Sequence, residues 1–344
     1  MVKQKKILII DDSRYIREYL AALFTSDSRF RVIGMAEDPY EAVKIIANEV
    51  PDVISLDIEM PRMSGVRFLK KIMRQHPIPV IIITNQSSRQ IGAAMEALNA
   101  GAVDVVSKKD ISPNDVDGKK MLIEKMWSAA NGKVSRMVAP EVHTVKNVSD
   151  APDQKIGDKI ILMGASSGGT QTITKILSAL PPSIPPILIV QHIPEKMSFL
   201  FAQRLNEMLP FYVKEAEDGD HVRANQVLIA QGNRHMELRY GKNDVSVRIS
   251  QGPPLNFVRP SVDKLFFSAL SKDPEKIVAI LLTGMGRDGA HGMLQLREKG
   301  AYTIAQDEAS SMIYGMPKAA RELGAAKKLM SPLEISNFIK NMLK

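Results

Sequence analysis

Short apolar runs recur along this chain, and each is followed by polar residues and then by a segment with helical spacing. In the first third of the chain these runs show no alternation of polar and apolar side chains, so they fit strands buried on both faces. Such strands, alternating with helices, are typical of a parallel sheet covered on both sides, and they predict an α/β unit. The expected strands span residues 7–10, 31–35, 53–56, 80–83 and 103–106.

Polar side chains stand at the ends of four of these strands. Asp11 and Asp12 follow the first strand, Asp57 the third, and Thr84 and Lys108 the fourth and fifth. One such aspartate is often only a cap residue, but parallel strands bring all five side chains to one edge of the sheet, where ligands bind. Three carboxylates there would repel unless a hard cation such as Mg2+ joined them, and a carboxylate can accept a phosphoryl group. A lysine and a hydroxyl could hold the oxygens of that group.

A second part of the chain opens on a strand that runs into a glycine-rich corner. Residues 160–163 are apolar, residues 164–168 match the pattern G-x-S-x-G, and residues 171–177 have helical spacing. In that pattern small neighbours let the backbone turn sharply and expose the serine hydroxyl, here that of Ser166, beside N–H groups that can stabilise an oxyanion. The pattern alone also fits a turn that caps a helix or cradles a phosphate.

Strand and helix patterns alternate again after this corner, which predicts a second α/β unit, doubly wound around its own, mainly parallel sheet. Its further strands are expected at residues 187–190, 226–230, 277–282 and 302–305. A stretch with prolines and no apolar periodicity separates the two units and indicates a linker. We place the first unit at residues 1–131, the linker at 132–156 and the second unit at 157–344.

A serine nucleophile needs a histidine base and usually a carboxylate that orients it. His192 is the best placed base, because it and Ser166 both follow strand ends; His235 is the runner-up, and His291 is a further candidate. Asp288 lies in a glycine-rich turn after another strand, where the orienting carboxylate is expected, although a turn aspartate is also common there. The chain order serine, histidine, acid differs from that of an α/β-hydrolase, so the ordinary hydrolase fold is disfavoured.

Composition excludes several classes of protein. The 344 residues include no cysteine, which rules out disulfides, thiolate metal sites and a cysteine nucleophile. There is no apolar run long enough for a membrane span or a secretory signal, so we expect a cytoplasmic protein without membrane insertion. The net charge of +8 is dispersed and aromatic residues make up only 5%, which disfavours nucleic-acid binding. A basic surface would suit an acidic protein substrate.

The first unit resembles the receiver domain of two-component response regulators over about residues 5–131. The resemblance lies in residues 11–13, 57–65, 84 and 104–108. It implies a flavodoxin-like receiver fold in which Asp57 is the phospho-acceptor and Asp11, Asp12 and Asp57 bind Mg2+. It also implies that Thr84 is the switch hydroxyl and that Lys108 is the partner of the phosphate.

The sequence departs from the receiver pattern at two positions. Val105 stands where many receivers carry an aromatic switch residue, and Lys109 stands where a proline usually follows the lysine. The first departure puts the aromatic half of the usual switch in doubt, and the second puts the geometry of that loop in doubt. The acceptor chemistry is untouched.

The second unit resembles the chemotaxis protein-glutamate methylesterases of the CheB family. With the receiver and the linker in the matching order, the resemblance covers nearly the whole chain. It implies that Ser166 is the nucleophile, His192 the base and Asp288 its orienting acid, with backbone N–H groups near Ser167 and Met285 as oxyanion donors. The matching motifs are residues 164–170, 191–194, 214–219, 232–238, 259–263 and 282–289.

This resemblance also implies substrates and partners. The family hydrolyses glutamate methyl esters on methyl-accepting chemoreceptors and deamidates selected receptor glutamines during chemotaxis adaptation. A chemotaxis histidine kinase is implied as the phospho-donor, and the unphosphorylated receiver is expected to cover the catalytic edge until phosphorylation opens it. Mg2+ is expected in the receiver, and no cofactor is expected for the esterase chemistry.

Two other functions stay open on the sequence alone. A receiver joined to a non-catalytic protein-binding unit would have Ser166, His192 and Asp288 dispersed in space. A DNA-binding response regulator would need a helix-turn-helix with a basic recognition helix after the linker, and the strands expected in the second unit argue against one. The positions of the three residues relative to each other discriminate the first alternative.

Overall fold

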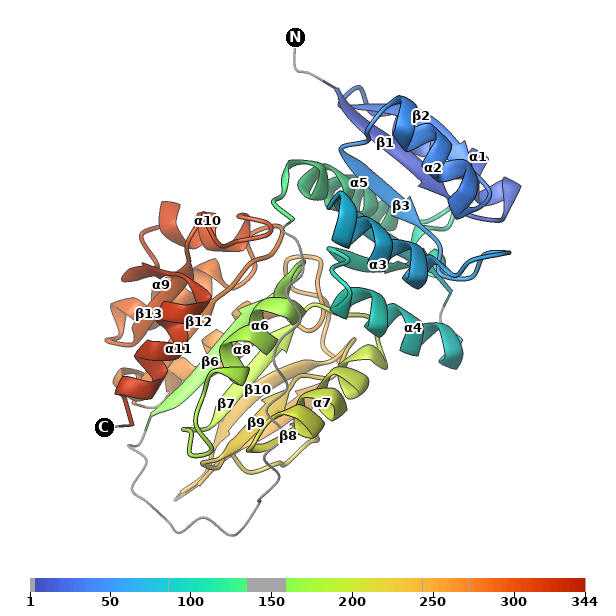
Figure 1. The fold of residues 1–344 in the computed structure, drawn as a ribbon. Helices are drawn as coiled ribbons and strands as arrows, with labels where there is room; N and C mark the ends of the chain where they lie inside the picture. Colours follow the sequence, from blue (N-terminus) through green and yellow to red (C-terminus); the bar gives the residue numbers. More distant parts are fainter. Residues whose placement is uncertain (1–3, 86, 135–158, 243, 272, 344) are drawn as a thin grey trace. The chain divides into compact units, whose positions relative to one another are not determined.

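The computed structural model describes all residues except 1–3, 86, 135–158, 243, 272 and 344 (Figure 1). The chain divides into two compact units, Met1–Ala139 and Pro140–Lys344. The limits predicted from the sequence, 1–131 and 157–344, stay a prediction, and most of the predicted linker at 132–156 lies outside the described residues. In the part of the chain that is described, no helix is long and apolar enough to cross a membrane.

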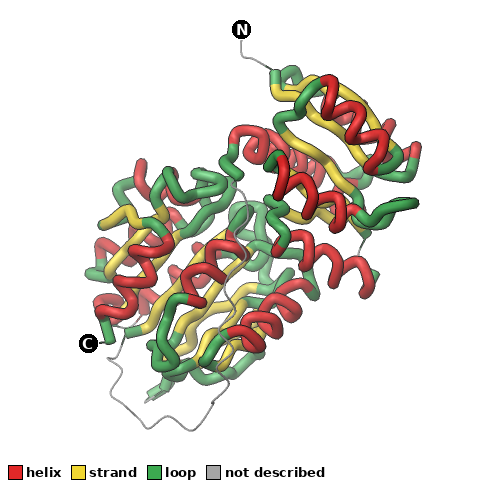
Figure 2. Tube along the Cα trace, in the orientation of Figure 1, coloured by secondary structure: helices red, strands yellow, loops and turns green. Residues whose placement is uncertain are grey.

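The first unit is a five-stranded parallel sheet with strand order β2-β1-β3-β4-β5, and helices cover the sheet (Figure 2). The α/β fold predicted for this part is confirmed. Its elements are β1 (Lys5–Ile10), α1 (Arg14–Thr25), β2 (Phe30–Ala36), α2 (Pro39–Asn48), β3 (Val53–Leu56), α3 (Gly65–Gln75), β4 (Val80–Thr84), α4 (Ser88–Asn99), β5 (Asp104–Ser107), a short 3-10 helix (Lys108–Ile111) and α5 (Val116–Asn131).

Burial and capping explain where these elements begin and end. Every residue of β3, β4 and β5 is buried, so β4 shows as a nearly continuous apolar run in the sequence, whereas β3 also buries Ser55 and β5 also buries Asp104 and Ser107. Each α-helix of the unit begins after a residue whose side chain accepts a hydrogen bond from an N–H of the first turn. These capping residues are Ser13, Asp38, Ser64, Ser87 and Asp115.

The second unit is built on a seven-stranded parallel sheet with strand order β14-β13-β12-β6-β7-β9-β8. The predicted doubly wound, mainly parallel fold is confirmed (Figure 1). Its elements are β6 (Ile160–Ala165), α6 (Gly169–Ser178), β7 (Ile187–Gln191), α7 (Met197–Met208), β8 (Tyr212–Glu215), β9 (Gln226–Ile229), β10 (His235–Tyr240), β11 (Val245–Ser250), α8 (Val262–Ser268), β12 (Ile277–Leu281), α9 (Ala290–Glu298), β13 (Tyr302–Gln306), α10 (Met316–Glu322), β14 (Lys328–Met330) and α11 (Pro332–Asn341), with 3-10 turns at Ala269–Ser271 and Pro274–Lys276.

The order in which strands are added to the sheet reverses at β6. From β6 the chain first builds β7, β9 and β8 on one side, and later builds β12, β13 and β14 on the other. The helices form two packed groups, α6 with α7 and α11, and α9 with α8 and α10. Crevices at the carboxyl ends of strands form where the strand order reverses, so the ends of β7, β6 and β12 are the expected place for a site.

An antiparallel hairpin of β10 and β11 forms a separate two-stranded sheet and lies in the chain between β9 and β12. Helix α8 packs on β10, so the hairpin and the helix form one insertion. The sequence predicted neither strand of this hairpin. The segment that joins the hairpin to α8, residues 251–261, supplies several of the contacts of the site.

Candidate functional site

The glycine-rich corner after β6 holds Ser166 in a tight turn. Its N–H donates to the carbonyl of Thr283, 3.0 Å away, and its own carbonyl accepts from the N–H of Gly169 at 2.7 Å. Gly168 has a left-handed φ of 75° and precedes α6, and a β carbon there would lie 2.8 Å from the Cβ of Met312. The corner therefore requires glycine at this position. It places Ser166, which is only 6% exposed, in the turn before α6.

The turn after β12 approaches the serine closely. A β carbon on Gly284 would lie 2.7 Å from the Cβ of Ser166 and 2.4 Å from the sulfur of Met316. No side chain fits in that space, so this glycine allows the two chain segments to touch. Met285, one of the predicted oxyanion residues, follows directly, and the carbonyl of Ser167, the other, accepts from the Thr283 hydroxyl at 3.1 Å.

His192 follows the neighbouring strand β7. Its N–H donates to the carbonyl of Ala165 at 3.0 Å. The side-chain amide of Gln191 donates to the carbonyls of both Ser166 (2.8 Å) and His192 (3.0 Å), so one buried amide ties the two corners together. Among the described residues no hydrogen bond joins the Ser166 hydroxyl to the His192 ring, and such contacts often tighten only when substrate binds.

Asp288 lies in the turn after β12 and contacts His192. Its Oδ2 lies 2.9 Å from Nε2 of the imidazole, and it also accepts from the N–H of Val262 at 2.6 Å. Its Oδ1 accepts from the Ser261 hydroxyl at 2.7 Å and from the Asn256 amide at 2.9 Å. The carboxylate is only 3% exposed, and every one of these partners fixes its orientation.

The surroundings of Asp288 keep it ionised. Burial by itself would raise its pKa, but the hydrogen bonds from His192, Asn256 and Ser261 outweigh burial and hold the pKa of Asp288 below its ordinary value. An ionised carboxylate only accepts, so the His192 nitrogen that faces it, Nε2, carries a proton. In the neutral imidazole the free lone pair is then on Nδ1. The structure thus brings Ser166, His192 and Asp288 together at three adjacent strand ends.

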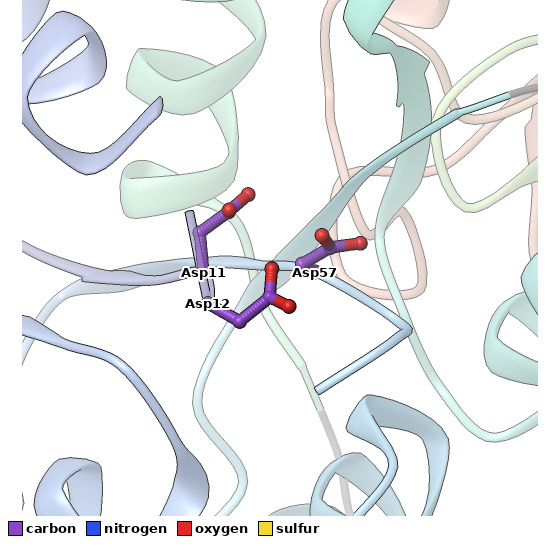
Figure 3. Close-up of side chains that lie close together, drawn as sticks. All are labelled: Asp11, Asp12 and Asp57. Atoms are coloured by element: carbon purple, nitrogen blue, oxygen red, sulfur yellow. The ribbon is translucent and has the colours of Figure 1, made fainter. Parts of the chain in front are cut away.

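The first unit brings together the predicted acidic residues. One carboxylate oxygen from each of Asp11, Asp12 and Asp57 lies within 4.8 Å of the others (Figure 3). The Lys108 ammonium lies 2.7 Å from Asp11 and 2.5 Å from Asp57. Burial, with the nearby Asp57 charge and against the contact with Lys108, raises the pKa of Asp11 to about 6. Thr84 Oγ1, at the end of β4, is buried without a hydrogen-bond partner among the described residues.

Comparison with known proteins assigns the chain to a family. The family model for the CheB methylesterase matches residues 161–339, and that for the response regulator receiver domain matches residues 7–117. A protein of Rhodospirillum rubrum named protein-glutamate methylesterase/protein-glutamine glutaminase 2 is 43% identical over 353 residues, which cover 97% of each chain. This chain belongs to the CheB methylesterase family.

Two further relatives agree with that assignment. The protein-glutamate methylesterase/protein-glutamine glutaminase of group 3 operon of Rhodopseudomonas palustris is 44% identical and covers 96% of this chain and 94% of its own. The crystal structure of the Thermotoga maritima CheB methylesterase catalytic domain is 34% identical, with a TM-score of 0.52, and covers 54% of this chain and 98% of its own. Membership of the CheB family makes this chain an enzyme of the methylesterase class, joined to a receiver.

The two other candidate bases of this CheB chain lie elsewhere. His235 is fully buried, and both its ring nitrogens are engaged: Nδ1 accepts from the N–H of Ser261 at 3.2 Å, and Nε2 donates to the carbonyl of Pro253 at 3.0 Å. It therefore fixes the segment that carries Ser261, and no ring nitrogen is free to act as a base. His291 is exposed in the first turn of α9.

Sequence reasoning missed the residues that hold Asp288. Ser261 and Asn256 contact its carboxylate, yet both lie in an irregular segment without periodicity. Ser261 also caps α8, because its side chain accepts from the N–H of Lys264. A serine before an apolar helical segment predicts such a cap, but it does not predict a contact with Asp288. The motif at residues 259–263 carries part of the family resemblance, but it predicts no role for Ser261.

The acidic cluster of the receiver fits a magnesium ion. Three carboxylates from Asp11, Asp12 and Asp57 supply the hard oxygen ligands that Mg2+ prefers, and their closeness is unfavourable without a cation. The Lys108 ammonium supplies part of the positive charge that the three carboxylates need, through its contacts with Asp11 and Asp57. Val105 is buried on β5, and the N–H of Lys109 donates to the hydroxyl of Ser107, so the loop after β5 closes without the usual proline.

Proposed function

We propose that this chain hydrolyses glutamate methyl esters on methyl-accepting chemoreceptors and deamidates selected receptor glutamines, under control of phosphorylation at Asp57. The observation that carries the esterase part is the contact between His192 Nε2 and the buried Asp288 carboxylate, at the strand end next to Ser166. Proteins that share 43% and 44% of their sequence with this chain bear the name protein-glutamate methylesterase/protein-glutamine glutaminase. The expected place of action is the cytoplasm.

In the proposed mechanism Nδ1 of His192 takes the hydroxyl proton of Ser166 as the oxygen attacks the ester carbonyl carbon. The new negative charge falls on the former carbonyl oxygen, for which backbone N–H groups near Ser167 and Met285 are the proposed donors. The imidazolium, stabilised by Asp288, returns its proton to the methoxy oxygen, and methanol leaves. A glutamyl ester on Ser166 is left.

Water completes the cycle by the same steps. His192 removes a proton from water, the hydroxide adds to the glutamyl ester, and the Ser166 oxygen leaves with the proton from the imidazolium. The products are the free enzyme and a glutamic acid side chain, which releases its proton to water and becomes a carboxylate. In deamidation the leaving group is ammonia in place of methanol, and no other step changes.

The proposal for the receiver uses the acidic cluster. Asp57 would accept a phosphoryl group from a chemotaxis histidine kinase, while Asp11, Asp12 and Asp57 would hold Mg2+. When bound, Mg2+ would neutralise the carboxylates and the phosphoryl oxygens. Lys108, which already lies 2.5 Å from Asp57, would pair with the phosphoryl group. Thr84 is the proposed switch hydroxyl, whose contact with the phosphoryl group would accompany a change of conformation in the receiver.

The experiment that tests the esterase is release of methanol from methylated receptor by the full chain. We expect Ser166→Ala to abolish release while phosphorylation of Asp57 by a small acyl phosphate and Mg2+ continues. Asp57→Asn is the complementary variant: it should keep the basal rate and lose the stimulation by the acyl phosphate. Methanol release that persists in Ser166→Ala would refute the assignment of the nucleophile. A wild-type rate that does not rise with the acyl phosphate would refute the proposed regulation by phosphorylation.

A further inference from the structure

The segment between β11 and α8 makes a tight turn beside the catalytic acid. The backbones of Leu255 and Val258 exchange two hydrogen bonds, each 3.1 Å long. The two residues between them, Asn256 and Phe257, both have positive φ, 55° and 63°. This is the pattern of a two-residue turn of type I′, in which asparagine is favoured and a bulky residue such as phenylalanine is strained.

The side chain of Asn256 bridges two buried carboxylates. Its Nδ2 donates to Oδ1 of Asp288 at 2.9 Å and to Oδ2 of Asp263 at 2.8 Å, so both amide hydrogens are used. The two carboxylates are 3% and 2% exposed. The second oxygen of Asp263 accepts from the N–H of Gly292 at 2.7 Å, so that carboxylate cannot turn away from the bridge without losing a bond.

Two carboxylates this close and this buried are unfavourable unless donors lie between them. Burial, followed by the charge of Asp288, raises the pKa of Asp263, whereas the pKa of Asp288 is lowered. The titratable groups that face Asp288 are therefore His192 at the end of β7 and Asp263 in the first turn of α8. Asn256 is a neutral donor placed between Asp263 and Asp288, where a carboxylate would add a third negative charge.

We propose that Asn256 is a positioning residue for the catalytic acid, which holds the Asp288 carboxylate against His192 Nε2 and shields it from Asp263. This inference rests on the proposed serine mechanism. Asn256 acts through Asp288, so its loss lowers kcat and leaves KM nearly unchanged. The left-handed turn explains the residue type, because asparagine adopts this conformation more readily than other residues with a side-chain donor.

The same turn supplies a matched control. Phe257 has the same left-handed backbone and, like Asn256, is exposed, but its side chain has no donor for a carboxylate. Glycine at either position keeps the turn, since glycine adopts positive φ without strain. Asn256→Gly removes the amide bridge, and Phe257→Gly makes the same change of backbone freedom one residue away. The pair separates the contribution of the amide from that of the loop.

The test compares full-length wild type, Asn256→Gly, Asn256→Asp and Phe257→Gly on a small nitrophenyl ester, with folding checked by thermal unfolding. A lost hydrogen bond to a charged group predicts a fall in kcat of about 10- to 100-fold for Asn256→Gly, with KM within about twofold of wild type. Asn256→Asp should fall at least as far at neutral pH, and the acid limb of its kcat/KM profile should move to higher pH. Phe257→Gly should keep the wild-type rate.

A double variant decides whether Asn256 acts through the acid. In the Asp288→Asn background, Asn256→Gly should cause no further loss, because the group that it positions is gone. A further loss as large as in wild type, or equal losses in Asn256→Gly and Phe257→Gly, would overturn the inference while leaving the serine mechanism standing. If Asn256→Gly does not fold, the acid-limb shift of Asn256→Asp decides alone. Wild-type turnover that does not depend on Ser166 would overturn both proposals.

Discussion

Replacement of His235 separates a structural histidine from a catalytic one, and the structure predicts how much each replacement costs. Asparagine can place its side-chain oxygen near the position of Nδ1 and so keep the acceptor for the Ser261 N–H, 3.2 Å away. Glutamine can place its amide nitrogen near Nε2 and so keep the donor to the Pro253 carbonyl, 3.0 Å away. Alanine keeps neither contact.

The hydrogen bond between His235 and Ser261 should contribute more to the free energy of unfolding than the one between His235 and Pro253. The Ser261 N–H is buried, so loss of its acceptor costs about 1–3 kcal/mol, whereas the carbonyl of Pro253 is only partly buried and can find water. Alanine also leaves a cavity at a fully buried site. We therefore expect free energies of unfolding in the order wild type, Asn, Gln, Ala, with a total loss of about 3–5 kcal/mol for His235→Ala.

Urea denaturation of the full chain and initial rates on a nitrophenyl ester measure the two effects separately. Because the chain has two units, urea denaturation can show one or two unfolding transitions. The free energy to compare is that of the transition that shifts when His235 is replaced. Per folded molecule, His235→Asn should keep the rate within about tenfold, whereas His192→Ala should lose on the order of 10^4-fold or more. A well-folded His235→Asn protein as inactive as His192→Ala would refute the reasoning and restore His235 as the base.

Three further outcomes follow from the contacts and electrostatics of the second unit. Gly284→Ala should lower the esterase rate by about 100-fold, because its β carbon would lie 2.7 Å from the Cβ of Ser166 and displace the nucleophile; an unchanged initial rate with a folded protein contradicts this. The lowered pKa of Asp288 stabilises the protein above about pH 4, and this stability is lost as the pH falls through the still lower folded pKa. Urea titrations from pH 2.5 to 7 should thus show the advantage over Asp288→Asn shrinking with acid, not growing. Ser331→Ala removes the capping box with Glu334 at the start of α11 and should cost about 0.5–2 kcal/mol, measured by urea denaturation; no change would mean that the cap is not formed in solution.

The parallel sheets were predictable because burial on both faces leaves a direct record in the sequence. All five residues of β12 are buried and all are apolar, so the strand shows as an uninterrupted run. The hairpin of β10 and β11 left no such record. Its strands, HMELRY and VSVRIS, alternate polar and apolar residues. This is the signal of a half-buried strand, which a search for uninterrupted apolar runs does not find.

The candidate triad was predictable for a related reason. Ser166, His192 and Asp288 follow the ends of three parallel strands, and parallel strands bring such ends together whatever the loops do. The residues that hold the acid were not predictable in this way. A two-residue turn is usually recognised by Asn-Gly, and here the turn is Asn256-Phe257, so the sequence gives only half of the signal.

The sequence also could not decide between His192 and His235 as the base, because the deciding contacts lie in the same irregular segment. A sequence shows that a histidine exists but not whether its ring nitrogens are free, and at His235 both are taken by backbone groups of one irregular segment. The imidazole of His235 thus holds the segment 251–261 at Pro253 and at Ser261. Ser261 and Asn256, which lies between these two anchor points, both donate to Asp288. The proposed catalytic acid, Asp288, is thus oriented by a loop that His235 fixes in turn. Substitutions at His235 should therefore reach the reaction only through Ser261 and Asp288, and Asn, which keeps the bond to Ser261, should disturb catalysis less than Gln.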